Sequence, residues 1–348
     1  MNLLFKSRQR SPSELVRLLR ELSMRLGASV TVDGSWFLAD VPQSSESRRK
    51  VHEEIWQALQ QSKLVLYGEG DSEPVPEQVA QLAQEVYQQQ LMPCLLTVMP
   101  RVEFETRKDI VQVFIALLQR QIGSRRPTVE YLRSHPTVVL MAFHGYDVPD
   151  MAMNTGLLLN EMVQHEPLAK ILLYSDDLAR FPTYIETTSF SVSCDAFKNL
   201  RDALLLHRTM AAEYLQQNYD TFFAMFTKLL DSSNYVTRRQ SLKLLSELLV
   251  DRAHYSTMVR YVSSEENLKR IMNALRDRSK HIQLEAFHVF KVFVANPKKT
   301  PAVEAILRRN KARLLTFLQD FLSDRTDESF MDERQYILQI ISAMPSKS

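Results

Sequence analysis

The sequence predicts an all-α protein built as a solenoid of stacked helical repeats, and three observations lead to this fold class. The segment from Ser233 to Asp251, SNYVTRRQSLKLLSELLVD, places its apolar residues at helical spacing and leaves its basic residues for another face. Segments with the same pattern recur along the chain. Only 7 glycines occur in 348 residues, which leaves few positions for the positive-φ turns that sheets and phosphate-binding loops need.

The repeats align on an aromatic residue at the start of each long helix. This aromatic position holds Phe104, Tyr146, Phe190 and Tyr235, and a degenerate fifth copy starts near Lys280. The step is roughly 42 to 45 residues, the length of an armadillo or HEAT repeat. Because one amphipathic helix cannot bury its own apolar face, each repeat is expected to cover the next.

The chain length favours the same architecture. A single core rarely serves more than about 250–300 residues, so a chain of 348 residues divides into domains or extends as a solenoid. We predict a single helical-repeat domain over residues 1–348. Residues 1–100 would form N-terminal capping helices with an irregular insertion at 27–47, residues 101–300 the repeats, and residues 301–348 the C-terminal capping helices.

Prolines and capping residues mark the expected helix boundaries. Ser11, Pro12 and Glu14 form a capping sequence for the first helix. Further helices are expected at about 48–67, at about 78–99 with a hinge near Pro93, and at about 302–308, 311–322 and 331–344. Between residues 27 and 47 the helical period is lost, and this segment is expected to be irregular or disordered.

Composition excludes several classes of protein. The 43 basic and 41 acidic residues are too balanced for a protein whose main task is gripping a phosphate backbone. Cys94 and Cys194 are too few for a disulfide framework, which favours a reducing cytoplasmic compartment. No apolar run approaches the roughly 18–20 residues that cross a bilayer, so no membrane insertion is expected.

Motifs that would carry chemistry are weak. The sequence HEEIW at 52–56 resembles a zinc-protease motif, but Trp56 stands where the second metal-binding histidine belongs. Gly68 and Gly70 lack the preceding strand of a nucleotide-binding loop, and no segment has the ligand spacing of a calcium loop. We therefore predict no catalytic residues, no metal and no cofactor.

Two features suggest binding, and each has a simpler alternative. The aromatic residues would form a ladder along one edge of the solenoid that could bind a partner. Alternatively, each ring would only make the apolar contact, called a hydrophobic staple, at the N-terminus of its own helix. Arg239 and Lys243 are four residues apart and share a helix face, where like charges repel unless an anion compensates them. That anion could belong to a bound carboxylate, or Glu247 or solvent could supply the compensation. Arg309 and Arg313 repeat the spacing.

Four long motifs carry a resemblance to a known family. They are IGSRRPTVEYL at 122–132, HEPLAK at 165–170, NYVTRRQSLKLLSELLVDR at 234–252 and QLEAFHVFKVFVANP at 283–297. They closely resemble the mouse-protein-twenty-five scaffold family, also called calcium-binding protein 39-like, and the resemblance covers the chain except the 27–47 insertion. It implies a curved right-handed solenoid without enzymatic activity.

The resemblance also implies partners and a binding site. Members of this family hold germinal-centre protein kinases, or the pseudokinase partner of a tumour-suppressor kinase, in an active-like conformation. The concave face takes the kinase lobe, and a pocket in the C-terminal half takes a short C-terminal Trp-Glu-Phe tail. The positions that match the pocket are Phe190, Tyr235, Arg239, Lys243, Tyr255, Met272, Arg309 and Arg313. The family typically has Lys at the last two positions and Phe at Tyr255.

A rival hypothesis is a generic helical-repeat adaptor for cargo or nucleic acid. An import receptor would need a repeated Trp/Asn ladder, yet Trp36 and Trp56 both precede the repeats. An RNA-reading repeat would have shorter units and a basic concave face. We therefore expect a cytoplasmic kinase-binding scaffold with no nucleic-acid partner.

Overall fold

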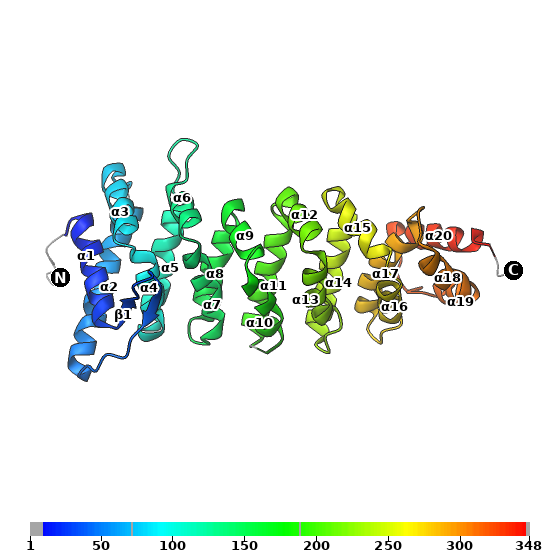
Figure 1. Cartoon of the computed structure of the whole chain (residues 1–348), viewed down its shortest axis with the longest axis horizontal. Helices are drawn as coiled ribbons and strands as arrows, with labels where there is room; N and C mark the ends of the chain where they lie inside the picture. The colour runs from blue at the N-terminus through cyan, green and yellow to red at the C-terminus, as the bar shows by residue number, and fades with distance from the viewer. Residues whose placement is uncertain (1–9, 71, 188, 346–348) are drawn as a thin grey trace. The chain divides into compact units, whose positions relative to one another are not determined.

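A computed structural model describes residues 10–70, 72–187 and 189–345. The outermost parts of the predicted capping regions, residues 1–9 and 346–348, lie outside the described residues. The chain forms two compact units, Met1–Leu206 and His207–Ser348, and each is described by itself (Figure 1). The prediction of one domain over the whole chain stays a prediction.

The first unit is almost entirely helical, as predicted. Its α-helices are α1 (Pro12–Arg25), α2 (Ser45–Tyr67), α3 (Pro76–Gln88), α4 (Leu91–Val98), α5 (Phe104–Gln119), α6 (Pro127–Ser134), α7 (Pro136–His144), α8 (Ala152–Val163), α9 (Glu166–Leu173), α10 (Phe181–Thr187) and α11 (Phe190–Leu205). Short 3₁₀ helices are η1 (Met99–Arg101), η2 (Gly145–Asp147) and η3 (Asp176–Arg180). The successive long helices α2, α5, α8 and α11 pack side by side, each on the next (Figure 1).

The second unit repeats this construction. It contains α12 (Arg208–Gln217), α13 (Tyr219–Leu230), α14 (Tyr235–Val250), η4 (Arg252–His254), α15 (Tyr255–Val262), α16 (Glu265–Ala274), α17 (Lys280–Ala295), α18 (Pro301–Arg309), α19 (Lys311–Gln319) and α20 (Glu328–Ala343). Helix α14 packs on α17, and α17 packs on α20. Each long helix therefore covers the apolar face of its neighbour, and the prediction of an all-α helical-repeat protein is confirmed.

Local sequence explains where the helices begin. Ser11 caps α1 in a full capping box with Glu14, as predicted. Asn234 caps α14, because its side-chain oxygen accepts hydrogen bonds from the Val236 and Thr237 amides. Proline occupies the first turn of α1, α3, α6, α7, α9 and α18, where its missing N–H costs nothing.

The insertion was predicted to be irregular, and this is wrong for its centre. Strands β1 (Ala28–Val30) and β2 (Trp36–Leu38) form an antiparallel hairpin in which Ala28 faces Leu38. The tight turn is closed by the Thr31 amide, which donates to the Ser35 carbonyl at 2.8 Å. Helical periodicity fails here because SVTV and WFL carry the two-residue period of strands, separated by an Asp-Gly turn.

A single arginine fixes the hairpin to the helices. Arg101 donates from Nη1 to the Leu26 carbonyl at 2.6 Å and to the Ala39 carbonyl at 2.7 Å, at the two ends of the hairpin. Gly27 lies beside these contacts with φ of 105°, and a Cβ there would meet the arginine side chain. Trp36 is half-buried and Phe37 is exposed, so Trp36 is the more covered of the two aromatic residues.

The aromatic position is confirmed in three repeats and wrong in the fourth. Phe104, Phe190 and Tyr235 are the first residues of α5, α11 and α14, and the fifth copy begins α17 at Lys280. Tyr146 instead lies in η2, six residues before α8 begins at Ala152, and is 3% exposed. The error arises because the long helix of this repeat starts later than the constant step predicts.

The described residues contain no helix long and apolar enough to span a membrane. Within the same ranges, no three His, Cys, Asp or Glu side chains are grouped so that they could hold a metal ion.

Candidate functional site

Helix α14 is the element that positions the candidate site. The cap at Asn234 starts the helix at Tyr235, and the stripe that includes Leu242 and Leu245 is buried in the second unit. That orientation leaves Tyr235 44% exposed, Arg239 half-buried and Lys243 exposed on successive turns. The three predicted residues of α14 therefore share one accessible face, as their four-residue spacing requires.

Arg239 has an acidic partner that its local sequence does not reveal. Its Nε lies 3.5 Å from Oε1 of Glu285 on α17, whose side chain is 10% exposed. The separation of the two residues is close to the repeat step, which is the signal that could have predicted the pair. An arginine has five N–H donors, so Arg239 retains donors for a second carboxylate, which would share the guanidinium with Glu285.

Met272 lies at the same end of α14 as Tyr235. It is in the last turn of α16 and half-buried. Two residues earlier, Arg270 donates from Nε to Asp231 Oδ1 at 2.9 Å, just before α14 begins. This ion pair joins the end of α16 to the residues just before α14. Met272 is two residues beyond Arg270, a spacing that turns it to another face of α16.

Arg309 and Arg313 are both exposed. Arg309 is the last residue of α18, and Arg313 lies in the first turn of α19. Helix α18 packs on α16, and its capping residue Thr300 donates to the Ser263 carbonyl at 3.1 Å. Arg309 thus lies on the helix that packs on α16, and Arg313 lies on the helix after it.

One predicted residue, Tyr255, lies at the other end of α14. Tyr255, 63% exposed, follows the C-terminal end of α14, and a helix of this length separates its ends by about 24 Å. The structure therefore does not bring Tyr255 to Tyr235. It lines a mostly apolar hollow of about 680 Å³ with Tyr336 of α20 and Val292 of α17. Phe190 belongs to the first unit, where it begins α11 and is 70% exposed.

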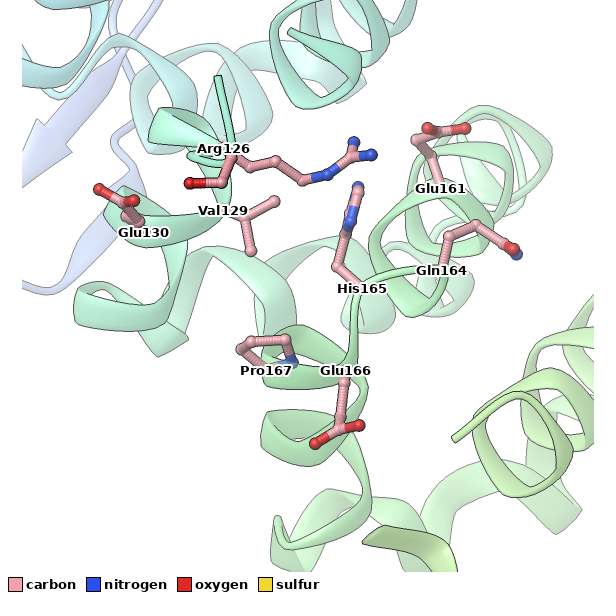
Figure 2. A pocket seen from close by; sticks show the side chains of 9 residues that line it. Arg126, Val129, Glu130, Glu161, Gln164, His165, Glu166 and Pro167 are labelled. Atoms are coloured by element: carbon pink, nitrogen blue, oxygen red, sulfur yellow. The ribbon is translucent and has the colours of Figure 1, made fainter. Parts of the chain in front are cut away.

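Two of the motifs that carried the family resemblance meet in the first unit. Residues of 122–132 and of 165–170 line a pocket of about 550 Å³ between α6, the end of α8 and the start of α9 (Figure 2). Figure 2 shows the Arg126 side chain extending toward the His165 ring, and Glu161 of α8 also lines the pocket. The walls carry both charges, so the pocket has no clear charge preference.

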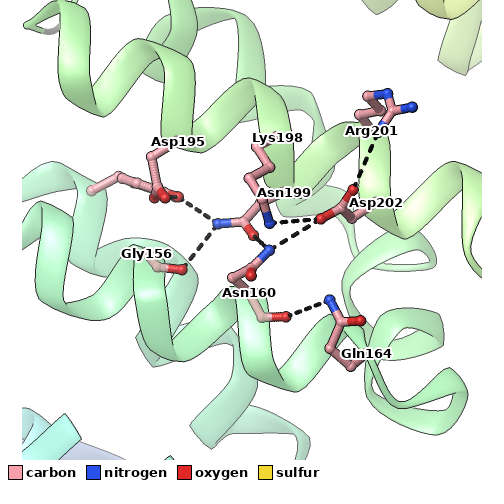
Figure 3. A network of polar contacts seen from close by, with 9 residues as sticks. Gly156, Asn160, Gln164, Asp195, Lys198, Asn199, Arg201 and Asp202 are labelled. Carbon is pink, nitrogen blue, oxygen red and sulfur yellow. Dashed lines mark hydrogen bonds and ion pairs between the residues drawn. The ribbon is translucent and has the colours of Figure 1, made fainter.

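The error at Tyr146 has a structural counterpart in a buried polar network between α8 and α11 (Figure 3). The Tyr146 hydroxyl donates to Asp195 Oδ2 at 2.6 Å and accepts from Asn199 Nδ2 at 2.7 Å. Asn199 is fully buried and also donates to the Gly156 carbonyl at 3.0 Å. Burial raises the pKa of Tyr146 and that of Asp195. Tyr146 thus orients two helices instead of presenting a ring to a ligand.

The network continues toward the surface. Asn160 donates from Nδ2 to Asn199 Oδ1 at 3.0 Å and to Asp202 Oδ2 at 3.2 Å, and Lys198 pairs with Asp202 at 2.9 Å (Figure 3). Each buried polar group described here has a hydrogen-bonding partner, so the network is structural in character.

The fold is that of a helical-repeat protein. Its exposed aromatic and basic side chains are suited to binding another molecule. The profile of the family described as Mo25-like matches residues 3–345. The chain belongs to the Mo25-like family.

Relatives from distant organisms match over nearly their whole length. The chain is 44% identical over 339 residues to a mouse protein named Calcium-binding protein 39-like, covering 97% of this chain and 96% of that protein. It is 44% identical over 345 residues to MO25-like protein 2 of Caenorhabditis elegans, covering 98% of each. It is 41% identical over 347 residues to the Mo25-like protein of Schizosaccharomyces pombe, covering 99% of this chain and 100% of that protein.

Proposed function

We propose that this protein is a non-catalytic scaffold that binds and activates germinal-centre protein kinases, or a pseudokinase partner of such kinases, in the cytoplasm. The observation that carries the proposal is membership of the Mo25-like family over nearly the whole chain. The accessible positions of Tyr235 and Arg239 on one face of α14 support it, because both match the family pocket for a Trp-Glu-Phe-like tail.

The proposed tail site divides recognition between charge and apolar contact. Arg239 would bind the tail glutamate, with Lys243 one turn further along the helix adding positive charge. Met272 and Tyr235 would form walls for an aromatic side chain, since the methionine side chain adapts to irregular apolar surfaces. Arg309 and Arg313 would replace the lysines of the family, and arginine offers a planar fork where lysine offers a point charge.

Activation would require no chemistry from the scaffold. A protein kinase is active only when its β3 lysine pairs with the glutamate of helix αC. A protein that binds the active arrangement more tightly than the inactive one shifts the population, and about 1.4 kcal/mol of preference changes the equilibrium tenfold. Affinity without such a preference would leave the rate unchanged.

The test is phosphotransfer by a germinal-centre kinase with and without the full-length protein. We expect a higher rate at saturating ATP, because the scaffold increases the fraction of competent kinase. A matched sample with an unrelated helical-repeat protein controls for non-specific stabilisation. Tight binding without any change in rate would contradict the activating role and leave a passive tether.

A further inference from the structure

A turn in the second unit displays two arginines beside the proposed tail site. Arg276 and Arg278 lie in the connection between α16 and α17 and are both exposed. The residue between them, Asp277, accepts a hydrogen bond from Arg238 Nη1 of α14 at 2.8 Å. Arg238 precedes Arg239 in the sequence, so the turn is attached next to the residue proposed to bind the tail glutamate.

Further hydrogen bonds hold this turn in place. The Ser279 amide donates to Asp277 Oδ1 at 2.9 Å, and Gln283 Nε2 donates to the Asp277 carbonyl at 2.7 Å. With the contact from Arg238, the middle residue of the turn is fixed by both its carboxylate and its backbone. The two flanking arginines are therefore presented on a defined backbone, which lowers the entropic cost of binding an anion there.

Four acids of the second unit have basic partners. Each pairs with a base of the same unit, in the pairs Asp277–Arg238, Glu285–Arg239, Asp231–Arg270 and Asp324–Lys280. In contrast, no carboxylate among the described residues pairs with Lys243, Arg276 or Arg278. Arg276 and Arg278 therefore carry positive charge at this turn that no described carboxylate offsets, although the whole chain carries only +2.

We propose that Arg276 and Arg278 form a basic edge that binds an acidic segment of the partner's polypeptide, immediately preceding its Trp-Glu-Phe-like tail. This inference rests on the proposed function, because the tail site fixes where the segment would run. Acidic side chains would lengthen the recognised sequence beyond the anchoring residues. They would also speed association, since complementary charge steers encounter.

The test compares two synthetic peptides that end in Trp-Glu-Phe. One carries glutamates in the preceding segment, and the other carries serine and glycine at the same positions. We expect the acidic peptide to bind the full-length protein about tenfold more tightly at low salt, with the difference shrinking at high salt as the charges are screened.

Charge-reversal variants locate the effect. Arg276→Glu with Arg278→Glu is expected to remove the advantage of the acidic peptide and leave affinity for the neutral peptide unchanged. The matched control is Arg48→Glu with Arg49→Glu, two exposed arginines of α2 in the first unit, which is expected to change neither. A far-ultraviolet circular dichroism spectrum confirms that each variant is folded.

The possible results separate the two proposals. Equal binding of the two peptides to the unmodified protein would overturn the basic edge and leave the tail site intact. Failure of both peptides to bind would overturn the tail site and this inference with it. An oligodeoxythymidine that binds with the affinity of the acidic peptide would identify a general polyanion surface and overturn the assignment of a polypeptide segment.

Discussion

Arg239 shows why the chemistry of a site depends on more than the residue type. On spacing alone it is one of a repelling pair with Lys243, four residues later. In the structure it shares its charge with Glu285, which is nearly buried, while 41% of the arginine side chain remains exposed. The guanidinium is thus oriented from one side and accessible from the other, a suitable arrangement for binding a carboxylate.

Truncation of the tail site is expected to abolish peptide binding without unfolding the protein. Arg239→Ala removes the carboxylate partner, and Met272→Ala removes part of the apolar wall. Each is expected to cost about 2 kcal/mol or more, as central interface residues do. The affinity of a Trp-Glu-Phe peptide, measured by titration calorimetry, checks this.

The matched control is Arg48→Ala, which removes an exposed arginine of α2 and is expected to bind the peptide normally. Normal peptide affinity in both Arg239→Ala and Met272→Ala would show that the family pocket does not transfer to these positions.

His254 gives a prediction about pH. It lies in η4 with no exposed surface, and neither ring nitrogen has a hydrogen-bonding partner among the described residues. Burial lowers its pKa, an effect that the nearby Arg208 reinforces and Asp251 opposes. The unfolded chain binds a proton here below about pH 6.5, while the folded chain resists it. The free energy of unfolding should therefore fall as the pH drops below that value.

Urea unfolding at a series of pH values measures this loss. His254→Gln is expected to show a shallower decline in unfolding free energy between pH 7.5 and 5.5, because one proton-linked group is removed. All other histidines are common to the two proteins, so their contributions cancel in the comparison. Identical slopes would mean that His254 is not a source of the acid sensitivity.

At the scale of elements, the sequence predicted the long helices best where the repeat is regular. The starts of α5, α11, α14 and α17 coincide with the predicted aromatic or equivalent position, because apolar periodicity indicates these boundaries, and in α14 the Asn234 cap marks the same boundary. The prediction fails where the chain departs from the regular helical repeat. The hairpin at 28–38 has a two-residue period, and Tyr146 enters a buried network that no local pattern reveals.

For Gly156, a residue of this network, we predict an effect of alanine substitution on stability that is opposite to the effect expected from helix propensity. Replacing glycine by alanine inside a helix normally stabilises it by about 1 kcal/mol. In α8, however, a Cβ at Gly156 would collide with the Asp195 carboxylate and crowd the Tyr146 hydroxyl. Gly156→Ala is therefore expected to lower the free energy of unfolding, because Asp195 must move and its hydrogen bond to Tyr146 is disrupted.

The denaturant midpoint of Gly156→Ala measures the effect. Gly156→Ala combined with Asp195→Ala is expected to be less destabilised than the sum of the single changes, since the second change removes the collision. An increase in midpoint for Gly156→Ala alone would show that helix propensity outweighs the network.

At the scale of the whole molecule, the family motifs specify more than the local patterns do. Periodicity and composition lead to an all-α repeat protein without an evident catalytic site. The candidate site could be predicted only through the resemblance, because its residues come from different helices. Contacts such as Arg239 with Glu285 depend on the stacking of α14 on α17. The resemblance groups Tyr255 with Tyr235 in one pocket, whereas the structure places the two residues at opposite ends of α14.

The proposed scaffold makes two kinds of contact with its partner, and the last prediction separates them. A tail that binds its own site tethers the kinase and raises its effective concentration at the activating surface, without itself favouring the active state. Deleting the tail should therefore raise the concentration of scaffold needed for half-maximal activation. The maximal rate at saturating scaffold should remain unchanged, because it depends on the preference for the active kinase.

Kinase assays over a range of scaffold concentrations, with intact and tail-deleted partner, measure both quantities. The Arg239→Ala scaffold with intact partner is the matched comparison, and it should reproduce the shift in half-maximal concentration. A lower maximal rate after tail deletion would contradict the division of roles, since it would make the tail part of the activating contact. Activation would then depend on the tail's own preference for the active state, which tethering does not supply.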